Sequence, residues 1–333
     1  MKKIYWIGDM INNTGPANVN KSYYSYLKDD AVFCFTNNKI MRIINFFINL
    51  PFRKVIFLSG FSVLNYILVR IANLFGKKTL YLMHGYASEE TKYKNCASHK
   101  KNNVENKLLN SVDKIICVSE KFSSFLKNEL PSLKDKINYV NNGVDDAICL
   151  KTENIKNKKN EDIYTIITVG GGTRIKNNIT ICKAIDKIYL KNKKIKFIVI
   201  GSLDEDGEQI KKYNFVEYYE KLPHEEVLSK MNRSDLYIQN SYFETFGLAV
   251  VESLSCNCDL LLSKNIGAIS VLQNINENSI INDNEDVEEI YKKIEKKMKN
   301  KKSINNDIIK FKNNSKWKDS SKKIIRECEF YND

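Results

Sequence analysis

The sequence predicts an α/β protein made of two doubly wound domains, each a parallel sheet with helices on both faces. Short apolar runs alternate with helix-like stretches along most of the 333 residues, a pattern typical of parallel sheets. A polar stretch at 151–162 interrupts the alternation, and chains of this length commonly hold two domains. We therefore predict an N-terminal domain at 1–150, a C-terminal domain at 151–312 and a final helical segment at 313–333.

The first half contains six short apolar runs, each bounded by polar or turn residues, which predict buried strands. The first run ends at Asp9, so it predicts a core strand rather than a signal peptide. Helices are expected at Asn18–Leu27, Val63–Phe75 and Glu120–Asn128. The predicted strands are Ile4–Ile7, Ala31–Phe35, Val55–Leu58, Thr79–Met83, Lys114–Val118 and Ile137–Val140.

The same alternation restarts after the polar stretch. Helices are expected at Ile179–Leu190, Glu225–Met231, Leu248–Cys256 and Val287–Lys299, and a last helix runs from Trp317 to about Glu329. The predicted strands are Tyr164–Val169, Lys196–Ile200, Phe215–Tyr218, Leu236–Gln239, Asp259–Leu262 and Ser279–Ile281.

Composition limits the class of protein. Hydrophobic residues make up 43% of the chain, and no run of about 18 apolar residues suggests a membrane span. Eight cysteines without paired spacing and only three histidines indicate reduced core thiols in a cytoplasmic protein and no metal site. The net charge is +13, and residues 1–150 hold 21 Lys and Arg against 12 Asp and Glu. Basic surface suits a phosphate-bearing ligand or an anionic membrane, although dispersed lysines are often only solvated.

The stretch 41–54 admits two interpretations. Its apolar and basic residues fit an amphipathic element lying at a membrane surface. They fit equally well a core helix that leads into the next strand.

Ligands of parallel sheets gather at the C-terminal ends of strands, and two candidates follow strands of the first half. Gly15, with Pro16, precedes a helix whose first amides favour phosphate, although a structural turn explains it equally well. His84 follows a central strand and suits a hydrogen bond to a ligand hydroxyl or phosphate, or else the capping of a turn.

The segment 170–177 in the second half reads Gly-Gly-Gly-Thr-Arg-Ile-Lys-Asn. Glycines such as Gly172 let the backbone approach a ligand closely. Arg174 and Lys176 bring two cations to the same place, which suits a diphosphate. The plain alternative is a glycine turn with two surface cations.

The segment 244–252 reads Glu-Thr-Phe-Gly-Leu-Ala-Val-Val-Glu. It predicts a turn at Phe246, Gly247 and Leu248 into a helix whose first amides would face a phosphate. Glu244 and Glu252 flank those amides and suit vicinal sugar hydroxyls. By spacing alone, one loop acid and one solvated helix acid explain the pair equally well.

Two further stretches resemble functional motifs. Residues 204–206, Asp-Glu-Asp, have the DxD form of metal-dependent transferases, but they lack its sequence context and predict a solvated turn. Residues 291–299 are basic and helical, and they predict a solvated face rather than a nucleic-acid site.

Six segments together resemble the family 4 retaining glycosyltransferases of the GT-B fold. The Glu244–Glu252 spacing matches the E-x7-E signature of that family, and the loop with Lys176 matches its phosphate-binding cations. The remaining matches are Gly15-Pro16, His84-Gly85, Val118-Ser119-Glu120 and Asn142-Gly143-Val144-Asp145. The resemblance implies that the two domains face each other across a cleft and that the helix with Trp317 crosses back to the N-terminal domain.

The resemblance also implies roles. Arg174 and Lys176 would hold the diphosphate, Glu252 the donor ribose and Glu244 the transferred sugar, while His84 would contact that sugar or the acceptor. Gly15, Gly172 and the backbone from Phe246 to Leu248 would help to bind the donor. Neither a metal nor a cofactor is expected. Gly171 stands where the family often has Arg, and Arg174 is expected to replace it.

The resulting hypothesis is a retaining hexosyltransferase that builds bacterial surface polysaccharide. It would use a nucleotide sugar and a glycan or lipid-linked saccharide acceptor at the inner face of the membrane, in peripheral contact with anionic lipid and without nucleic acid. Two alternatives stay open, a catalytically silent partner subunit and a nucleotide-sugar 2-epimerase on the same fold.

Overall fold

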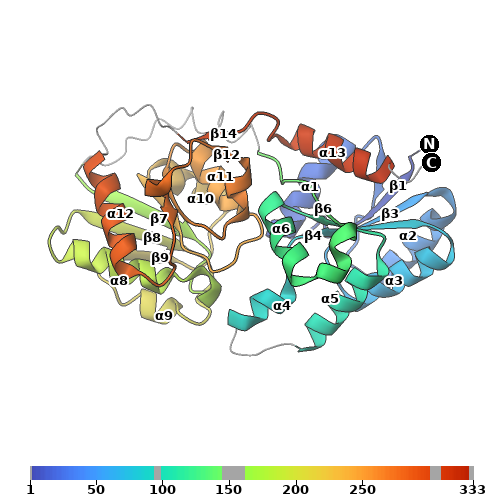
Figure 1. Ribbon diagram of the computed structural model, residues 1–333, viewed down its shortest axis with the longest axis horizontal. Coiled ribbons are helices and arrows are strands. Elements are labelled where there is room, and N and C mark those ends of the chain that lie inside the picture. Colours follow the sequence, from blue (N-terminus) through green and yellow to red (C-terminus); the bar gives the residue numbers. More distant parts are fainter. Residues whose placement is uncertain (1, 94–98, 145–161, 301–308, 330–333) are drawn as a thin grey trace. The chain divides into compact units, whose positions relative to one another are not determined.

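The computed structural model describes residues 2–93, 99–144, 162–300 and 309–329. The chain forms two compact units. Unit 1 comprises Met1–Thr91, Ala97–Gly143 and Asn314–Asp333, and unit 2 comprises Lys92–Cys96 and Val144–Asn313. Asp145, the boundary expected after residue 150 and nearly all of the polar stretch 151–162 lie outside the described residues. Figure 1 shows the elements of each unit.

Unit 1 is built on a six-stranded parallel sheet in the order β2-β1-β3-β4-β5-β6. The order reverses beside β1, as in other doubly wound sheets. The strands are short and almost wholly buried. They are β1 (Ile4–Ile7), β2 (Ala31–Phe33), β3 (Val55–Ser59), β4 (Lys78–Met83), β5 (Lys114–Cys117) and β6 (Ile137–Tyr139).

The helices of unit 1 lie in the connections between its parallel strands, and such crossover connections are right-handed in nearly all proteins. The connection from β1 to β2 runs one way along the sheet and carries α1 (Gly15–Leu27), whereas the connections from β2 to β5 run the other way. They carry α2 (Lys39–Asn49), α3 (Val63–Leu74), the single turn α4 (Ala87–Glu90) and α5 (His99–Ser111). Helix α6 (Glu120–Glu129) leads to β6, and α13 (Trp317–Glu329) packs beside α1 (Figure 1).

Aromatic side chains fill the core between β1 and the last helix. Trp6 stacks on Phe57 with 3.9 Å between ring centroids, and Tyr23 meets Trp6 from α1 at 5.3 Å. The Trp317 ring packs edge-on against Tyr23 at 5.2 Å, and Trp317 is 5% exposed. A Cβ on Gly143 would lie 2.3 Å from the Trp317 Cα, so the backbones of the two segments are in contact. The C-terminal helix is therefore part of the core of unit 1.

Unit 2 repeats the design with a parallel sheet in the order β13-β11-β10-β7-β8-β9. Its strands are β7 (Tyr164–Val169), β8 (Ile195–Ile200), β9 (Val216–Tyr219), β10 (Leu236–Gln239), β11 (Asp259–Ser263) and β13 (Ile280–Ile281). Its helices are α8 (Asn178–Tyr189), the single turn α9 (Gly207–Ile210), α10 (His224–Asn232), α11 (Leu248–Ser255) and α12 (Val287–Lys299). A small antiparallel pair joins β12 (Leu272–Gln273) to β14 (Lys310–Phe311).

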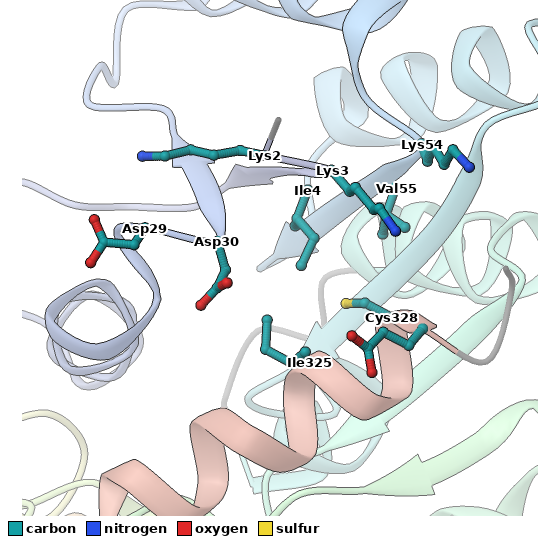
Figure 2. Close-up of a pocket in the computed structure, with 10 residues that line it drawn as sticks. Lys2, Lys3, Ile4, Asp29, Asp30, Lys54, Val55, Ile325 and Cys328 are labelled. Carbon is teal, nitrogen blue, oxygen red and sulfur yellow. The ribbon is translucent and has the colours of Figure 1, made fainter.

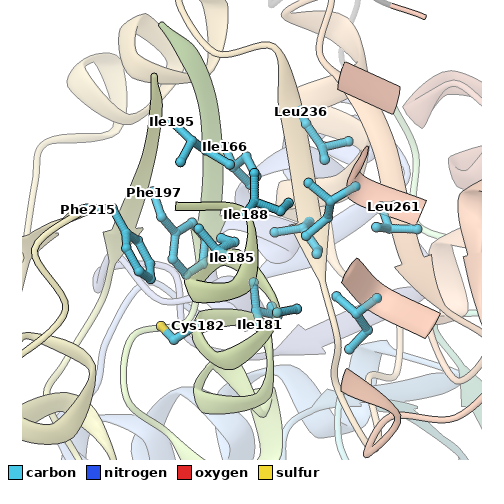
Figure 3. Close-up of a cluster of buried hydrophobic side chains, with 14 of the residues drawn as sticks. Ile166, Ile181, Cys182, Ile185, Ile188, Ile195, Phe197, Phe215, Leu236 and Leu261 are labelled. Atoms are coloured by element: carbon cyan, nitrogen blue, oxygen red, sulfur yellow. The ribbon is translucent and has the colours of Figure 1, made fainter. Parts of the chain in front are cut away.

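The core of unit 2 lies between the sheet and the helices α8 and α12 (Figure 3). Ile166 of β7, Phe197 of β8 and Leu236 of β10 point into it, and each is fully buried. Ile181 and Ile185 recur at a spacing of four residues on α8, so that helix turns one apolar face to the strands. Alternating strand residues make the sheet half of this core.

The predicted fold class is confirmed. All twelve predicted strands are present, with bounds shifted by at most two residues. The prediction did not include α5 or the antiparallel pair β12–β14. The residues of α5 are hydrophilic on average, and its apolar residues do not gather clearly on one face of the helix. The sequence therefore gives no helical periodicity for it.

We predict that Trp317→Ala lowers the free energy of unfolding by about 3–5 kcal/mol, because a buried aromatic side chain would leave a cavity against Tyr23. Urea titration followed by circular dichroism measures this change. The control is Lys318→Ala at an exposed position of the same helix, with an expected change within about 0.5 kcal/mol. Equal effects of the two substitutions would contradict the packing described for α13.

Candidate functional site

The glycine loop after β7 adopts a backbone that only glycine accepts readily. Gly170 and Gly171 have φ values of +132° and +61°. A Cβ on Gly171 would lie 2.1 Å from the Ser202 carbonyl oxygen, and a Cβ on Gly172 would lie 1.9 Å from the Leu203 carbonyl oxygen. The glycine loop therefore rests directly on the backbone of the loop after β8. This contact also explains why no arginine stands at position 171.

Arg174 is directed toward acidic residues rather than toward the other predicted site residues. Its side chain is half exposed, and its Nε lies 4.0 Å from Asp206 Oδ1. Its backbone N–H donates to Glu205 at 3.2 Å. Burial raises the pKa of Asp206, and the Arg174 charge opposes that rise. The prediction that residues 204–206 form a merely solvated turn was incomplete, because Asp204 also accepts a hydrogen bond from Thr173 at 2.8 Å.

Lys176 and Glu244 are brought together at the C-terminal edge of the sheet. The Lys176 ammonium donates to Glu244 Oε2, and both side chains are about one-fifth exposed. The loop after β7 carries Lys176 and the loop after β10 carries Glu244, and β7 and β10 are hydrogen-bonded neighbours. Strand order therefore converts a sequence separation of 68 residues into a direct ion pair.

A short chain of hydrogen bonds orients Glu244 from inside the sheet. Gln239 Nε2, at the end of β10, donates to Glu244 Oε2 at 3.0 Å. The buried Tyr237 hydroxyl donates in turn to Gln239 Oε1 at 2.9 Å. Since an amide cannot rotate freely when both of its ends are bonded, the carboxylate of Glu244 is held in place. Sequence analysis did not identify Gln239 as part of the site.

The turn at 246–248 starts α11 as predicted. Gly247 has a φ of +94° and precedes the first helical residue, Leu248. No side chain caps this helix, although its start is fully described. Its first amides are thus suited to an anion. Phe246 is buried and its carbonyl accepts from the Ala268 N–H at 2.6 Å, which fixes the turn.

Glu252 lies inside α11 and contacts a residue that the sequence did not single out. His224 Nε2, at the start of α10, lies 2.9 Å from Glu252 Oε1. The Glu252 side chain is 18% exposed, whereas the His224 side chain is 55% exposed. Glu252 is therefore neither free in solvent nor buried in the core, and its one resolved side-chain partner is a histidine at the surface of unit 2.

Buried asparagines join three strand-end loops beneath the site. Asn177 and Asn240 each donate through Nδ2 to the Asn284 carbonyl, at 2.7 and 2.8 Å. Asn284 Nδ2 returns a bond of 2.9 Å to the Asn240 carbonyl. These residues follow β7, β10 and β13 in the chain. The sequence shows them only as three of many asparagines, so no local signal could have marked them.

Gly15 and His84 belong to unit 1. Gly15 is the first residue of α1, and a Cβ there would meet nothing within 4 Å. The Thr14 hydroxyl caps the same helix by accepting from the Ala17 N–H at 3.3 Å. His84 follows β4, and its Nε2 lies 2.7 Å from the Ser59 hydroxyl at the end of β3. Burial lowers the pKa of His84 to about 4, so the ring is neutral at pH 7.

A buried carboxyl supports the loop that follows His84. Glu105 of α5 is fully buried, and its Oε2 accepts from the Ala87 N–H at 2.8 Å. Burial raises the pKa of Glu105 to about 7. The carboxyl thus caps the single turn α4, which begins three residues after His84. Sequence analysis missed Glu105 because α5 itself was not predicted.

The pocket in Figure 2 lies at the other end of the unit 1 sheet, by the starts of β1 and β3. Its volume is about 450 Å³. The charged side chains around it balance, and they are Lys2, Lys3 and Lys54 against Asp29, Asp30 and Glu329. Because ligands of such sheets bind at the C-terminal ends of strands, this pocket is not part of the candidate site.

The described part of the chain also lacks two features, a membrane-spanning helix and a metal-binding cluster. No helix there is both long and apolar enough to cross a membrane. Within the same residues, no group of three or more His, Cys, Asp or Glu could hold a metal ion. The thiols of Cys256 and Cys258 are buried and directed at backbone carbonyls of α10 and the turn after it.

Comparison with known proteins identifies the family. Residues 151–316, which contain the glycine loop, the Lys176–Glu244 pair and α11, match the family model "Glycosyl transferases group 1". This chain is a group 1 glycosyltransferase. The GPI3 subunit of the Saccharomyces cerevisiae phosphatidylinositol N-acetylglucosaminyltransferase is 26% identical over 209 residues, which are 60% of this chain and 45% of the relative.

A second curated relative is the O-antigen biosynthesis glycosyltransferase WclY of Escherichia coli. It is 30% identical over 164 residues, which cover 45% of this transferase and 43% of the relative. The chain therefore spans less than half the length of these curated relatives.

Solved structures show the fold of the transferase to be GT-B. Anabaena HepE, crystallised with UDP and glucose, matches with a TM-score of 0.66 at 13% identity and covers 99% of this chain and 100% of its own. A UDP-forming α,α-trehalose-phosphate synthase from Burkholderia xenovorans matches with a TM-score of 0.68 at 9% identity, over 98% of this chain and 100% of its own.

We predict that Gly171→Ala lowers the free energy of unfolding by about 2 kcal/mol or more, because it forces a positive φ and a 2.1 Å contact with Ser202. Gly15→Ala is the matched control, with a change below about 1 kcal/mol, since its Cβ would meet open space at a helix start. Denaturant titration of both variants tests the difference. A harmless Gly171→Ala would show that the glycine loop is not held against the loop after β8.

Glu105 predicts a pH-dependent stability. Between its ordinary pKa of 4.5 and its folded value of about 7, the folded protein keeps a proton that the unfolded chain has lost. The free energy of unfolding therefore falls as pH rises through this window. We expect Glu105→Gln to gain about 1–3 kcal/mol relative to wild type between pH 5 and pH 8.

Unfolding titrations of both proteins at several pH values measure this difference. The depressed pKa of His84 acts in the opposite direction, because it removes stability as pH falls below 6.5. That contribution is common to both proteins and cancels in the comparison. A difference between wild type and Glu105→Gln that stays constant with pH would refute the assignment.

Proposed function

We propose that this transferase moves a hexose from a nucleotide-sugar donor to a glycan or lipid-linked saccharide acceptor with retention of configuration. The observation that carries the proposal is the Lys176–Glu244 pair beside the uncapped start of α11, at the C-terminal edge of the unit 2 sheet. This place combines a cation, helix amides and a carboxylate, which are the groups that a sugar nucleotide requires.

The diphosphate of the donor is assigned to Lys176 and the first amides of α11. Lysine supplies a point charge, and helix-start amides supply directed donors. Both would stabilise the negative charge that develops on the leaving diphosphate. Arg174 is assigned a weaker part than the sequence suggested, since its guanidinium already lies 4.0 Å from the Asp206 carboxylate. Gly172 contributes because, without a Cβ, it lets the backbone of this loop rest against the loop after β8.

The two glutamates are assigned to hydroxyl groups. Glu244 is held by Gln239 and would accept from hydroxyls of the transferred sugar. Glu252 would accept from the donor ribose, in exchange for its contact with His224. Phe246 and Gly247 fix the turn between them, and Leu248 starts the helix. Neither glutamate is assigned the acid–base role found in glycoside hydrolases.

We assign the remaining roles to unit 1. A neutral His84 suits a hydrogen bond to the transferred sugar or to the acceptor, and Gly15, where a Cβ would meet nothing within 4 Å, leaves room for the donor beside the start of α1. In the proposed reaction, the acceptor oxygen forms a bond to the anomeric carbon on the face from which the diphosphate leaves. The acceptor proton passes to the departing phosphate oxygen. No metal or cofactor takes part in this scheme.

Relatives support the choice of acceptor and pathway. WclY is named for O-antigen biosynthesis, and the GPI3 subunit for transfer of N-acetylglucosamine to phosphatidylinositol. HepE has been crystallised with UDP-glucose, so a UDP-linked donor is the first to test. We propose that this transferase works on bacterial surface polysaccharide at the inner face of the cell membrane, in peripheral contact with anionic lipid.

We predict that a nucleotide-sugar donor raises the melting temperature of the wild-type protein. Ligand at 100 times its dissociation constant stabilises by roughly 2.7 kcal/mol. A thermal-shift screen of UDP, GDP and ADP sugars measures this effect. Lys176→Ala should abolish the shift, while Lys183→Ala at an exposed position of α8 should keep it. Unchanged melting with every nucleotide would refute the donor site.

Transfer itself is tested with the donor that the screen selects. Glu244→Ala should lower turnover of that donor at least about tenfold, because it removes a partly buried hydrogen-bonding charge from the sugar. Equal background turnover in wild type and Glu244→Ala would support a silent partner subunit instead. Turnover of UDP-N-acetylglucosamine without an acceptor, giving its 2-epimer, would support an epimerase.

A further inference from the structure

Helix α2 of unit 1 exposes apolar side chains to solvent, whereas an ordinary surface helix buries them against the core. Within this fully described helix, Phe46 alone is buried. Its apolar side chains face solvent, with exposed fractions between 37% and 69%. We call these residues the apolar face of α2, namely Ile40, Met41, Ile43, Ile44, Phe47 and Ile48. At about 100° per residue they span an arc of about 160°.

On the opposite side of α2, Arg42 and Asn49 bond to residues of the protein instead. The Arg42 guanidinium donates to the Thr36 carbonyl at 3.0 Å and to Asn37 Oδ1 at 3.2 Å. Asn49 Oδ1 accepts from Arg53 Nε at 3.4 Å. The Arg42 guanidinium also lies 3.5 Å from the Gly8 carbonyl oxygen in the loop after β1, so this side of α2 faces the sheet. The question left open by the sequence, core helix or interfacial element, is decided against the core helix.

Neighbouring elements also expose apolar side chains. Phe52, which follows α2, is 57% exposed. Helix α3 packs beside α2 (Figure 1) and exposes Val63 and Ile67 at a spacing of four residues. Exposed apolar side chains gathered on adjacent elements in this way mark a candidate interaction surface.

The charge around this face selects one partner. Residues 31–88, which include α2 and α3, contain seven Lys and Arg and no Asp or Glu. Of these cations, Lys39 of α2 and Arg70 of α3 are exposed, whereas Lys54 lines the charge-balanced pocket of Figure 2. A second copy of the chain would bring the same cations against them and be repelled. An anionic bilayer offers both phosphate headgroups for the cations and acyl chains for the apolar residues.

We propose that the apolar face of α2 docks unit 1 onto an anionic lipid surface. The helix lies in the plane of the headgroups, with Ile44 and Phe47 at the centre of the inserted arc. Lys39 and Arg70 contact lipid phosphates at its margins. The docking proposal does not depend on the proposed transfer reaction. Only the role of docking in transfer rests on the proposed function.

The docked face lies close to the functional edge of unit 1. Asn38 caps the start of α2, in the segment that follows β2. Asn37 Nδ2 donates to Asp9 Oδ1 at 3.0 Å, in the loop that leads from β1 to Gly15. The start of α2 therefore meets the same sheet edge as Gly15. Docking would hold that edge near the headgroups, where a lipid-linked acceptor presents its saccharide.

Vesicle flotation of the full chain tests the proposal. We expect wild type to bind phosphatidylcholine vesicles that contain 30% phosphatidylglycerol. Its affinity for pure phosphatidylcholine vesicles should be at least about tenfold lower. The double variant Ile44→Glu with Phe47→Glu should lose binding at least about tenfold. Leu190→Glu, at a position of unit 2 that is 71% exposed, is the matched control and should bind as wild type. Circular dichroism checks that each variant is folded.

Insertion is tested separately from adsorption. Ile44→Trp places a reporter on the face, and its emission should shift to shorter wavelength with the anionic vesicles only. Absence of wild-type binding to every vesicle, unchanged binding of the double variant, or an unshifted emission would overturn the proposal. A concentration-dependent dimer that the double variant abolishes would assign the face to a second copy instead. Donor-induced thermal shifts in the double variant then report on the transfer site independently.

Discussion

The ion pair between Lys176 and Glu244 is the contact on which the candidate site depends. It joins the loop after β7 to the loop after β10, and it forms because those strands are neighbours in the sheet. The glycine loop positions Lys176 within reach of Glu244, and the Gln239 amide holds the Glu244 carboxylate by a hydrogen bond. A diphosphate entering this place would compete with Glu244 for the ammonium. The pair thus keeps two charged side chains satisfied and positioned while no donor is bound.

Much of the fold was predictable because its signals are local. Each strand of a doubly wound sheet is a short apolar run, so Ile4–Ile7 and Tyr164–Val169 could be placed without knowing their partners. The uncapped start of α11 was predictable for the same reason, since Gly247 marks the turn. Helix α5 escaped because its residues are mostly polar, and Glu105 escaped with it.

The partners of each site residue were not predictable, because they come from distant parts of the chain. Sequence spacing placed Arg174 and Lys176 together as two cations for one diphosphate. The structure separates them, with Arg174 beside Asp206 and Lys176 beside Glu244. A two-residue step is enough to direct neighbouring side chains to different loops. The buried asparagines illustrate the same limit, since Asn177, Asn240 and Asn284 meet only once the sheet has formed.

The two units differ in how their charged and apolar side chains are accommodated. Unit 2 satisfies its charges internally, as the pairing of Arg174, Lys176 and Glu252 with residues of the same unit shows. Unit 1 instead leaves an acid-free segment with an outward apolar face, an arrangement that loses free energy in water and gains it only against a partner. That face begins at the sheet edge that carries Gly15. Under the proposed docking, this surface would bring the functional edge of unit 1 to an acceptor that is itself held at a lipid surface.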